Sequence, residues 1–134
     1  MTLLGENPNC ARTFVSFRPM GESLDVAEVT AQIGLAPDGI GERSSRRVWS
    51  ISSEGRIQTT SVEQHLRLLL DMLGPHQAAV LALIEDRSLD ADFFCFWESA
   101  TGNGGPEVSP ETLARIATLR ATLGFDFYPP VTEG

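Results

Sequence analysis

Arginine is the residue type whose spacing points most directly to binding chemistry. Arg43, Arg46 and Arg47 stand within five positions, next to two serines, in the polar segment 38–47. Guanidinium groups form forked hydrogen bonds that suit phosphates and carboxylates, so these arginines with the nearby Trp49 are a candidate anion site. The segment lacks the glycine-rich phosphate loop that leads into a helix. A solvated loop followed by a core tryptophan is the alternative interpretation.

Acidic side chains form the second candidate group. The net charge is −8 and uneven: residues 1–57 hold seven acids and six arginines (−1), and residues 58–134 hold eleven acids and four arginines (−7). This excess argues against a nucleic-acid ligand, whose phosphates need a basic surface, and is compatible with a basic protein partner. A repulsive surface that only keeps the protein soluble is the plainer alternative. The acids expected to face a partner are Glu85, Asp86, Asp90, Asp92 and Glu98.

The residues give little support for catalysis or metal binding. His65 and His76 lack the spacing of zinc peptidases. Asp90 and Asp92 share one face of a predicted strand, where exposed positions explain them without a shared proton. We therefore expect no catalytic residues, no metal and no cofactor.

Length and hydropathy indicate one cytoplasmic domain. The chain has 134 residues, of which 42% are hydrophobic, and no run approaches the roughly 20 apolar residues of a membrane span. The start has no signal-peptide pattern. A cytosolic setting favours Cys10 and Cys95 as buried thiols, although neighbouring strands could bring them together as a disulfide. We expect a single α+β domain over 1–134, with irregular structure at 1–9 and 130–134.

The strand predicted at residues 89–98 organises the other elements. Its odd-numbered positions are apolar: Leu89, Ala91, Phe93, Cys95 and Trp97. Its even-numbered positions are acidic at the ends, with Phe94 and Phe96 between them. One face is therefore buried throughout and the other only in the middle, which predicts a place inside a sheet.

Periodicity and end signals predict the remaining elements. Three more strands are expected, over residues 10–18, 48–52 and 125–128. Four helices are expected, over residues 23–33, 60–73, 76–86 and 109–123. Ser23 is the expected cap of the first helix, Thr60 or Ser61 caps the second, and Gly34 and Gly124 follow the first and last helices. The segment 76–86 also fits a buried strand, but its alanines favour a helix.

The order of elements predicts the architecture. Strand, helix, strand, two helices, strand, helix, strand makes two βαβ units joined by a helical pair. The simplest packing is a four-stranded sheet with the helices mainly on one face, a relative of the ferredoxin-like arrangement. The opposite face, where open, would be rich in aromatic side chains and would suit a homodimer.

Several short motifs together resemble a known family. Residues 14–17 read FVSF, residues 33–38 read IGLAPD, and residues 125–128 read FDFY, with the Trp49 strand and the His65-Leu66 helix between them. Over about residues 12–128 the chain resembles the mainly bacterial family called domain of unknown function 4279. The basic, glycine-containing segment expected before the tryptophan has a loose match at residues 41–47. The resemblance implies a small α+β domain and brings no activity and no functional residues.

These observations favour a small cytoplasmic interaction protein whose acidic second half binds a basic partner. Some small acidic families resemble immunity proteins that neutralise bacterial toxins, so an immunity-like inhibitor is the narrowest version, by analogy of fold. Such an association would weaken with salt. The alternative is a small-anion-binding protein that uses Arg43, Arg46 and Arg47. We expect no nucleic-acid ligand and no membrane insertion.

Overall fold

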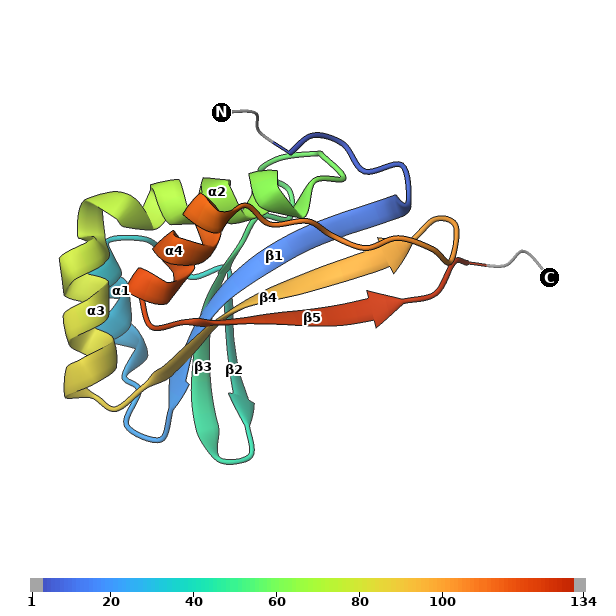
Figure 1. Ribbon diagram of the computed structural model, residues 1–134. Helices are drawn as coiled ribbons and strands as arrows, with labels where there is room; N and C mark the ends of the chain where they lie inside the picture. The colour runs from blue at the N-terminus through green and yellow to red at the C-terminus, as the bar shows by residue number, and fades with distance from the viewer. Residues whose placement is uncertain (1–3, 132–134) are drawn as a thin grey trace.

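The fold is built on a mixed five-stranded sheet, seen in a computed structural model that describes residues 4–131 (Figure 1). The strands are β1 (Cys10–Gly21), β2 (Gly39–Arg43), β3 (Arg46–Ser52), β4 (Asp90–Ser99) and β5 (Thr122–Tyr128). The helices are α1 (Val26–Ile33), α2 (Val62–Leu73), α3 (Gln77–Asp86) and α4 (Pro110–Thr118), with the 3-10 helix η1 (Gly74–His76) between α2 and α3. The α+β class is confirmed.

The strand order is β2-β3-β1-β4-β5, with every neighbouring pair antiparallel except the parallel pair β4 and β5. Of the ends predicted to be irregular, residues 4–9 and 130–131 contain no helix or strand. The rest of those two ends, residues 1–3 and 132–134, lies outside the described residues.

Side-chain alternation along β1 and β4 separates two faces of the sheet. Phe17 lies opposite Phe93 on the face covered by helices, with ring centroids 5.0 Å apart. Phe14 lies opposite Phe96 on the other face, with stacked rings 4.8 Å apart. The odd positions from 91 to 97 are buried and β4 lies between β1 and β5, which confirms one buried face and a place inside the sheet. Phe94 and Phe96 are only half-buried, so the burial expected in the middle of the second face is not matched.

Residues 38–47 form most of a β-hairpin and not the predicted polar loop. Ser44 and Ser45 have φ values of 51° and 66°, as the two central residues of a type I′ turn require. β2 and β3 pair on either side of them. The prediction of four strands was therefore wrong, because β2 is a fifth strand at the sheet edge. The hairpin also leaves β3 antiparallel to β1, so residues 10–52 form no parallel βαβ unit and the ferredoxin-like arrangement is not matched.

The second predicted βαβ unit is present, with shifted boundaries. β4, α4 and β5 follow one another, and β5 lies beside β4 in parallel. α4 ends at Thr118 and not near Leu123, and β5 begins at Thr122. Gly124 therefore lies inside the strand, opposite Phe94, and does not stop the helix. Pairing with β4 satisfies the backbone groups that a longer helix would otherwise have satisfied.

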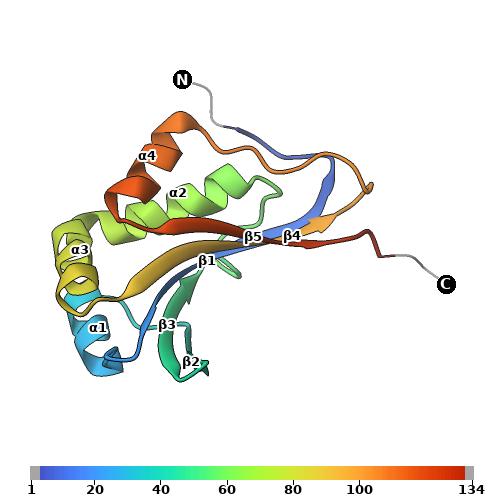
Figure 2. The same cartoon turned by 60° about the horizontal axis from the view of Figure 1, so that its bottom comes forward.

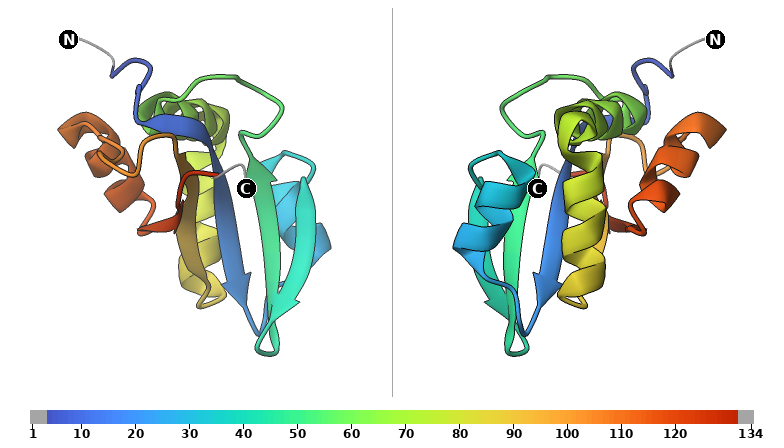
Figure 3. Two further views of the ribbon diagram at one scale, coloured as in Figure 1. Left: turned by 90° about the vertical axis from the view of Figure 1, so that its right-hand side faces the viewer. Right: turned by 90° about the vertical axis from the view of Figure 1, so that its left-hand side faces the viewer.

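The helices gather on one side of the sheet, and the opposite face carries no helix of the described chain (Figures 2 and 3). α1 begins with Asp25 as its cap, and the predicted cap Ser23 instead donates its hydroxyl hydrogen bond to the Arg87 carbonyl. Gly34 ends α1 with a φ of 76°, as predicted. The His76 ring packs so closely there that a Cβ at position 34 would lie 2.8 Å from it. Only glycine meets both requirements.

α2, η1 and α3 together form a helical stretch, Val62–Asp86, with the length and mean hydropathy, 1.3, of a membrane span. The chain bends at η1, so the two helices run in different directions (Figure 1). α2 buries Leu66 and Leu69 completely in the core beneath the sheet. α2 contributes most of the buried residues of this stretch, whereas α3 buries only Val80, Leu83 and Ile84. The helix expected at 76–86 is confirmed as α3.

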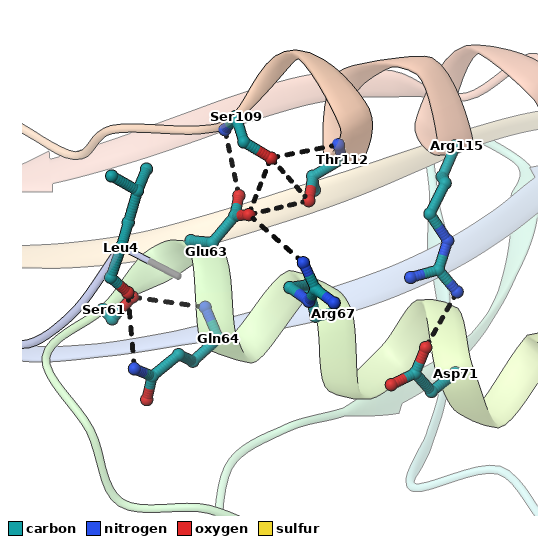
Figure 4. Close-up of polar contacts among 9 residues, drawn as sticks. All are labelled: Leu4, Ser61, Glu63, Gln64, Arg67, Asp71, Ser109, Thr112 and Arg115. Atoms are coloured by element: carbon teal, nitrogen blue, oxygen red, sulfur yellow. Dashed lines mark hydrogen bonds and ion pairs between the residues drawn. The ribbon is translucent and has the colours of Figure 1, made fainter. Parts of the chain in front are cut away.

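A buried carboxylate fixes α4 to α2 (Figure 4). The Glu63 residue is 1% exposed. Its side chain accepts hydrogen bonds from the Ser109 N–H at 3.0 Å, the Ser109 hydroxyl at 2.7 Å and the Thr112 hydroxyl at 2.9 Å. These donors stand at the N-terminus of α4, where backbone N–H groups lack helical partners and the helix dipole favours negative charge. Glu63 thus supplies from α2 a cap that α4 needs.

The first prediction concerns this contact. Glu63→Gln should lower the free energy of unfolding by about 2–3 kcal/mol, because the buried donors lose a charged acceptor and the new amide faces an N–H group. Asp71→Asn is the matched control, since Asp71 pairs with Arg115 between the same helices at 2.9 Å but is 67% exposed. Its effect should stay within about 0.5 kcal/mol. Urea unfolding followed by circular dichroism measures both, and equal effects would contradict this account of α4 docking.

Candidate functional site

The uncovered side of the sheet is a continuous surface of rings and charged groups, which we call the open face. We define it by Arg12, Phe14 and Arg18 of β1, Asp92, Phe94, Phe96 and Glu98 of β4, and Asp126 and Tyr128 of β5. Its rings form a row across three strands, because Phe96 stacks on Phe14 and lies 4.8 Å from the Tyr128 ring. An aromatic surface was expected for the face opposite the helices, where that face is open.

Arg18 shows how the open face holds a guanidinium group. Its Nε and one Nη donate to the two carboxylate oxygens of Asp92 at 2.9 and 2.7 Å. Its guanidinium carbon lies 4.3 Å from the centroid of the Phe94 ring. The hydrogen bond with Asp92 raises the pKa of Arg18. Forked hydrogen bonds and a ring face are the two strongest ways in which protein side chains bind a guanidinium.

Arg12 repeats this arrangement near the other end of β1. Its guanidinium lies 5.3 Å from the Phe14 centroid and 5.4 Å from the Phe96 centroid. It forms an ion pair with Glu54, in the loop after β3. Two arginines of the chain therefore sit on this face with the same combination of ring and carboxylate.

The hairpin distributes the predicted anion-binding arginines over both faces of the sheet. Arg43 and Arg46 are cross-strand partners and share a face. Arg47 is the cross-strand partner of Glu42 on the other face. Arg46 forms an ion pair with Asp90, so its charge is already compensated. Arg43 and Arg47 have no ion pair within residues 4–131. The structure does not bring the three guanidinium groups together.

Trp49, the aromatic member of the predicted anion site, lies in the core. Its side chain is fully buried, and its indole N–H donates to the Thr30 hydroxyl at 3.1 Å. This bond ties β3 to α1. The ring therefore contributes packing and takes no part in the hairpin surface, where Ile40 is exposed together with the charged residues.

Three of the five acids predicted to meet a partner are paired within the chain. Asp90, Asp92 and Glu85 form ion pairs with Arg46, Arg18 and Arg120, respectively. Asp86 and Glu98 have no ion pair in the part of the chain that the structure describes. Glu98 lies on the open face, whereas Asp86 ends α3 on the helical side. The fold thus separates these acids onto different surfaces.

Ser53 and His65 form a buried pair that was not predicted from the sequence, and they are 0% and 1% exposed. The His65 Nδ1 lies 2.6 Å from the Ser53 hydroxyl, and its Nε2 lies 2.8 Å from the Thr59 carbonyl. Because a carbonyl can only accept, Nε2 carries the proton and Nδ1 accepts from the serine. The Ser53 oxygen also accepts from the Val15 N–H at 2.8 Å.

The Ser53 and His65 pair holds structure in place. Its serine hydroxyl is buried and fully bonded, and a carbonyl occupies the position where a catalytic dyad would have an orienting carboxylate. The contacts tie both ends of the loop 53–61 to α2. One feature of the sequence could have indicated that His65 is buried. It stands beside Leu66, on the apolar stripe of a predicted amphipathic helix.

A groove of about 500 Å³ lies between this loop and β1. Residues 11–14 of β1 form one wall, residues 54–60 form the other, and Glu6 and His65 also line it. Arg12 and Phe14 belong to both the groove and the open face, so the two surfaces are continuous. Within residues 4–131, no group of three or more His, Cys, Asp or Glu side chains is placed to hold a metal ion.

Comparison with known proteins gives one match. The sequence profile described as "Domain of unknown function (DUF4279)" matches residues 11–130, which is most of the chain. The chain belongs to this family. The searches of curated proteins and of solved structures returned no match. The resemblance found in the short motifs is confirmed, and the surfaces above have to be interpreted from their own chemistry.

In this DUF4279 domain both cysteines are buried free thiols, as expected. Cys10 and Cys95 lie in β1 and β4. Burial raises the pKa of Cys95 to about 12 and raises that of Cys10 as well. Both side chains therefore stay protonated at neutral pH and act as small apolar core groups.

The second prediction follows from the buried imidazole. Burial lowers the pKa of His65 below its usual 6.5, while the Thr59 carbonyl and Glu6 offset part of this effect. The neutral ring is therefore the native form. Its contribution to stability is complete above pH 6.5 and is lost as pH falls from 6.5 toward the lowered pKa, with a slope approaching about 1.4 kcal/mol per pH unit.

His65→Gln should lower the free energy of unfolding by about 1–3 kcal/mol at pH 7.5, because buried partners lose their hydrogen bonds. It should also flatten the dependence of stability on pH between 6.5 and 5. Urea titrations at several pH values measure both effects, and His76→Gln, which removes the other, half-buried histidine, is the comparison variant. A His65→Gln protein with the wild-type slope would contradict this assignment.

Proposed function

We propose that this DUF4279 domain is a small cytoplasmic interaction protein that binds a basic protein partner through the open face of its sheet. The observation that carries the proposal is the way this face holds the chain's own arginines. Arg18 lies between a ring and a carboxylate, and Arg12 repeats the combination. Arginine side chains of a partner would find the same chemistry there.

The β5 end of the open face offers rings and carboxylates beside Arg12, which lies over Phe96 and is the cross-strand partner of Glu98 but forms its ion pair with Glu54. The Tyr128 ring packs against Phe96 in a tilted arrangement, and its hydroxyl donates to Asp126 at 2.7 Å, which raises the pKa of Tyr128. Glu98 is the cross-strand neighbour of Tyr128. Neither Glu98 nor Asp126 forms an ion pair with another residue of the described chain. This end of the row is where a basic side chain from outside would be compensated.

The total charge supports the same kind of partner. The chain carries −8, and eight of its ten arginines are already used in ion pairs within residues 4–131. The remaining acids would accelerate encounter with a positively charged protein. The narrower proposal is an immunity-like inhibitor that covers a basic surface of a toxin. A second copy of the chain is the competing occupant of the open face, and sedimentation would reveal it as a dimer.

The third prediction tests the open face with a defined probe. We expect the full chain to bind a fluorescent hexa-arginine peptide in 20 mM salt and to bind it more weakly in 200 mM salt. We expect no binding of a hexa-glutamate peptide. The double variant Glu98→Gln with Asp126→Asn should weaken binding about 5- to 30-fold, because two charge pairs of about 0.5–1 kcal/mol each are lost. Fluorescence anisotropy measures the affinities.

The matched control is the double variant Glu107→Gln with Glu111→Gln. It removes the same net charge from two exposed positions in and just before α4, away from the open face. It should bind the hexa-arginine peptide with nearly the affinity of the wild type, with only the small decrease that follows from the lower net charge. Equal weakening by both double variants would show that the peptide senses only total charge, and the proposed face would be wrong.

A second candidate function is the binding of a small anion at the β2–β3 hairpin. It is favoured by one observation: Arg43 and Arg47 are the two arginines that form no ion pair within residues 4–131. Both are exposed and flank the tight turn. A multivalent anion at the tip could reach both charges from opposite sides.

The fourth prediction separates this candidate from the first. If the hairpin binds anions, phosphate or citrate at ten times its dissociation constant should raise the melting temperature by about 3 °C or more, from a stabilisation of about 1.4 kcal/mol. The double variant Arg43→Gln with Arg47→Gln should lose this shift. Arg115→Gln with Arg120→Gln removes equal charge elsewhere and should keep it. A flat thermal response of the wild type across both anions would remove this candidate.

A further inference from the structure

β1 is longer than β3, its neighbour on one side. Part of that edge of β1 therefore has no strand partner. β4 pairs with β1 from Cys10 to Met20, whereas β3 pairs with it only from Ser16 to Gly21. Along residues 11–14, the side of β1 away from β4 meets no other strand of the described chain. Main-chain groups on such an edge can pair with an added extended chain.

The direction of these main-chain groups follows from their neighbours. The Val15 N–H donates to the Ser53 hydroxyl at 2.8 Å, and the Val15 carbonyl accepts from the Ser53 N–H at 2.9 Å. The main-chain groups of Val15 therefore point away from β4. Because the direction repeats every second residue in a strand, those of Thr13 point the same way. Thr13 lines the groove and is 5% exposed, so its N–H and carbonyl point toward the floor of the groove, and an added strand must reach them there.

The groove has the size and rigidity for a short extended segment. Its volume is about 500 Å³, and one wall is the unpaired stretch 11–14. Four residues of a strand extend about 13 Å, so about four residues of a peptide could align with it. His65 holds the other wall through its bonds to Ser53 and Thr59. A preformed wall lowers the entropy cost of binding.

Charge decides which kind of peptide suits the groove. The charged side chains that line it, apart from the neutral His65, are Glu6, Arg12 and Glu54, and the last two pair with each other. Hydrogen bonds from Thr60 lower the pKa of Glu6, so its carboxylate is ionised at neutral pH. Among residues 4–131 the groove thus has one carboxylate without an ion pair, that of Glu6, with the Phe14 ring nearby. A lysine or arginine complements both.

We propose that the groove between β1 and residues 54–60 binds an extended segment of a partner protein, which adds to the edge of β1 as a strand and places a basic side chain beside Glu6. The added strand would continue the line of β3 beyond Ser53. This mode of binding depends on main-chain pairing at Thr13, whereas the proposed function depends on Glu98 and Asp126. Either can fail without the other.

The test uses the full chain and a blocked peptide, acetyl-Thr-Arg-Val-Arg-Thr-amide, as the probe. On titration, the backbone amide NMR signals of Ala11 and Thr13 should shift together, with saturation. N-methylation of the central valine removes a main-chain donor and should weaken binding at least tenfold. Replacement of both arginines of the probe by glutamate should do the same. Both comparisons leave the protein unchanged, so misfolding cannot produce the result.

Two tryptophan variants locate the site. Gln58 is exposed and lines the groove, so Gln58→Trp should fill it and weaken probe binding at least tenfold. Gln77→Trp makes the same change at an exposed position of α3 and should bind within twofold of the wild type. The open-face variant Glu98→Gln with Asp126→Asn should bind within about threefold, since its charges lie outside the groove.

Four results would overturn the proposal. The first is equal binding by the two tryptophan variants, and the second is an N-methylated probe that binds like the original. The third is a dimer in sedimentation that Gln58→Trp dissociates, because it would identify a second copy of the chain as the occupant. Loss of probe binding only in the open-face variant would also exclude the groove, while it would support the proposed function.

Discussion

The antiparallel register of β1 and β4 is the constraint on which the rest of the structure depends. It places Phe17 opposite Phe93 beneath the helices and Phe14 opposite Phe96 on the open face. A slip of one residue would exchange the two faces of one strand, putting Arg18 into the core and Phe17 into solvent. The cost of burying an unpaired charge and exposing a ring defines this register sharply. The core, the open face and the unpaired edge of β1 all follow from it.

The excess of acids does not produce a uniformly acidic surface, because the sheet interleaves the two halves of the chain. Arg18 and Asp92 are 74 positions apart in sequence and meet as neighbours on adjacent strands. That forked pair is only 16% and 18% exposed, whereas more exposed pairs such as Arg115 with Asp71 each contribute little to stability. These ion pairs engage most of the arginines of the chain. They therefore decide which acids remain free to bind a partner. That is why the functional proposal rests on Glu98 and Asp126 at one end of the aromatic row, while Asp86 lies on the helical side.

The buried polar side chains of this domain are of residue types that often act in catalysis, but here they hold helices and loops together. Glu63 and His65 stand two positions apart on α2, one bonded to the start of α4 and the other to the loop after β3. Buried polar groups destabilise a fold unless they are bonded, and the atoms of this pair are. α2 therefore joins the sheet, α4 and the groove wall. The surfaces left with unused binding capacity are the open face and the groove, which are suited to recognition of another chain.

The sequence alone determined the features that depend on neighbouring positions. The buried strand at 89–98, the apolar stripe of α2, the left-handed Gly34 and the aromatic open face could be predicted, because periods of 2.0 and 3.6 and end signals are local properties. The turn at Ser44 and Ser45 gave no comparable signal, so β2 and the direction of β3 were missed. Only the tertiary structure decided which arginine pairs with which acid, how His65 is hydrogen-bonded, and that β1 extends beyond the end of β3. These features are contacts between segments far apart in the chain, and no local pattern encodes which segments will meet.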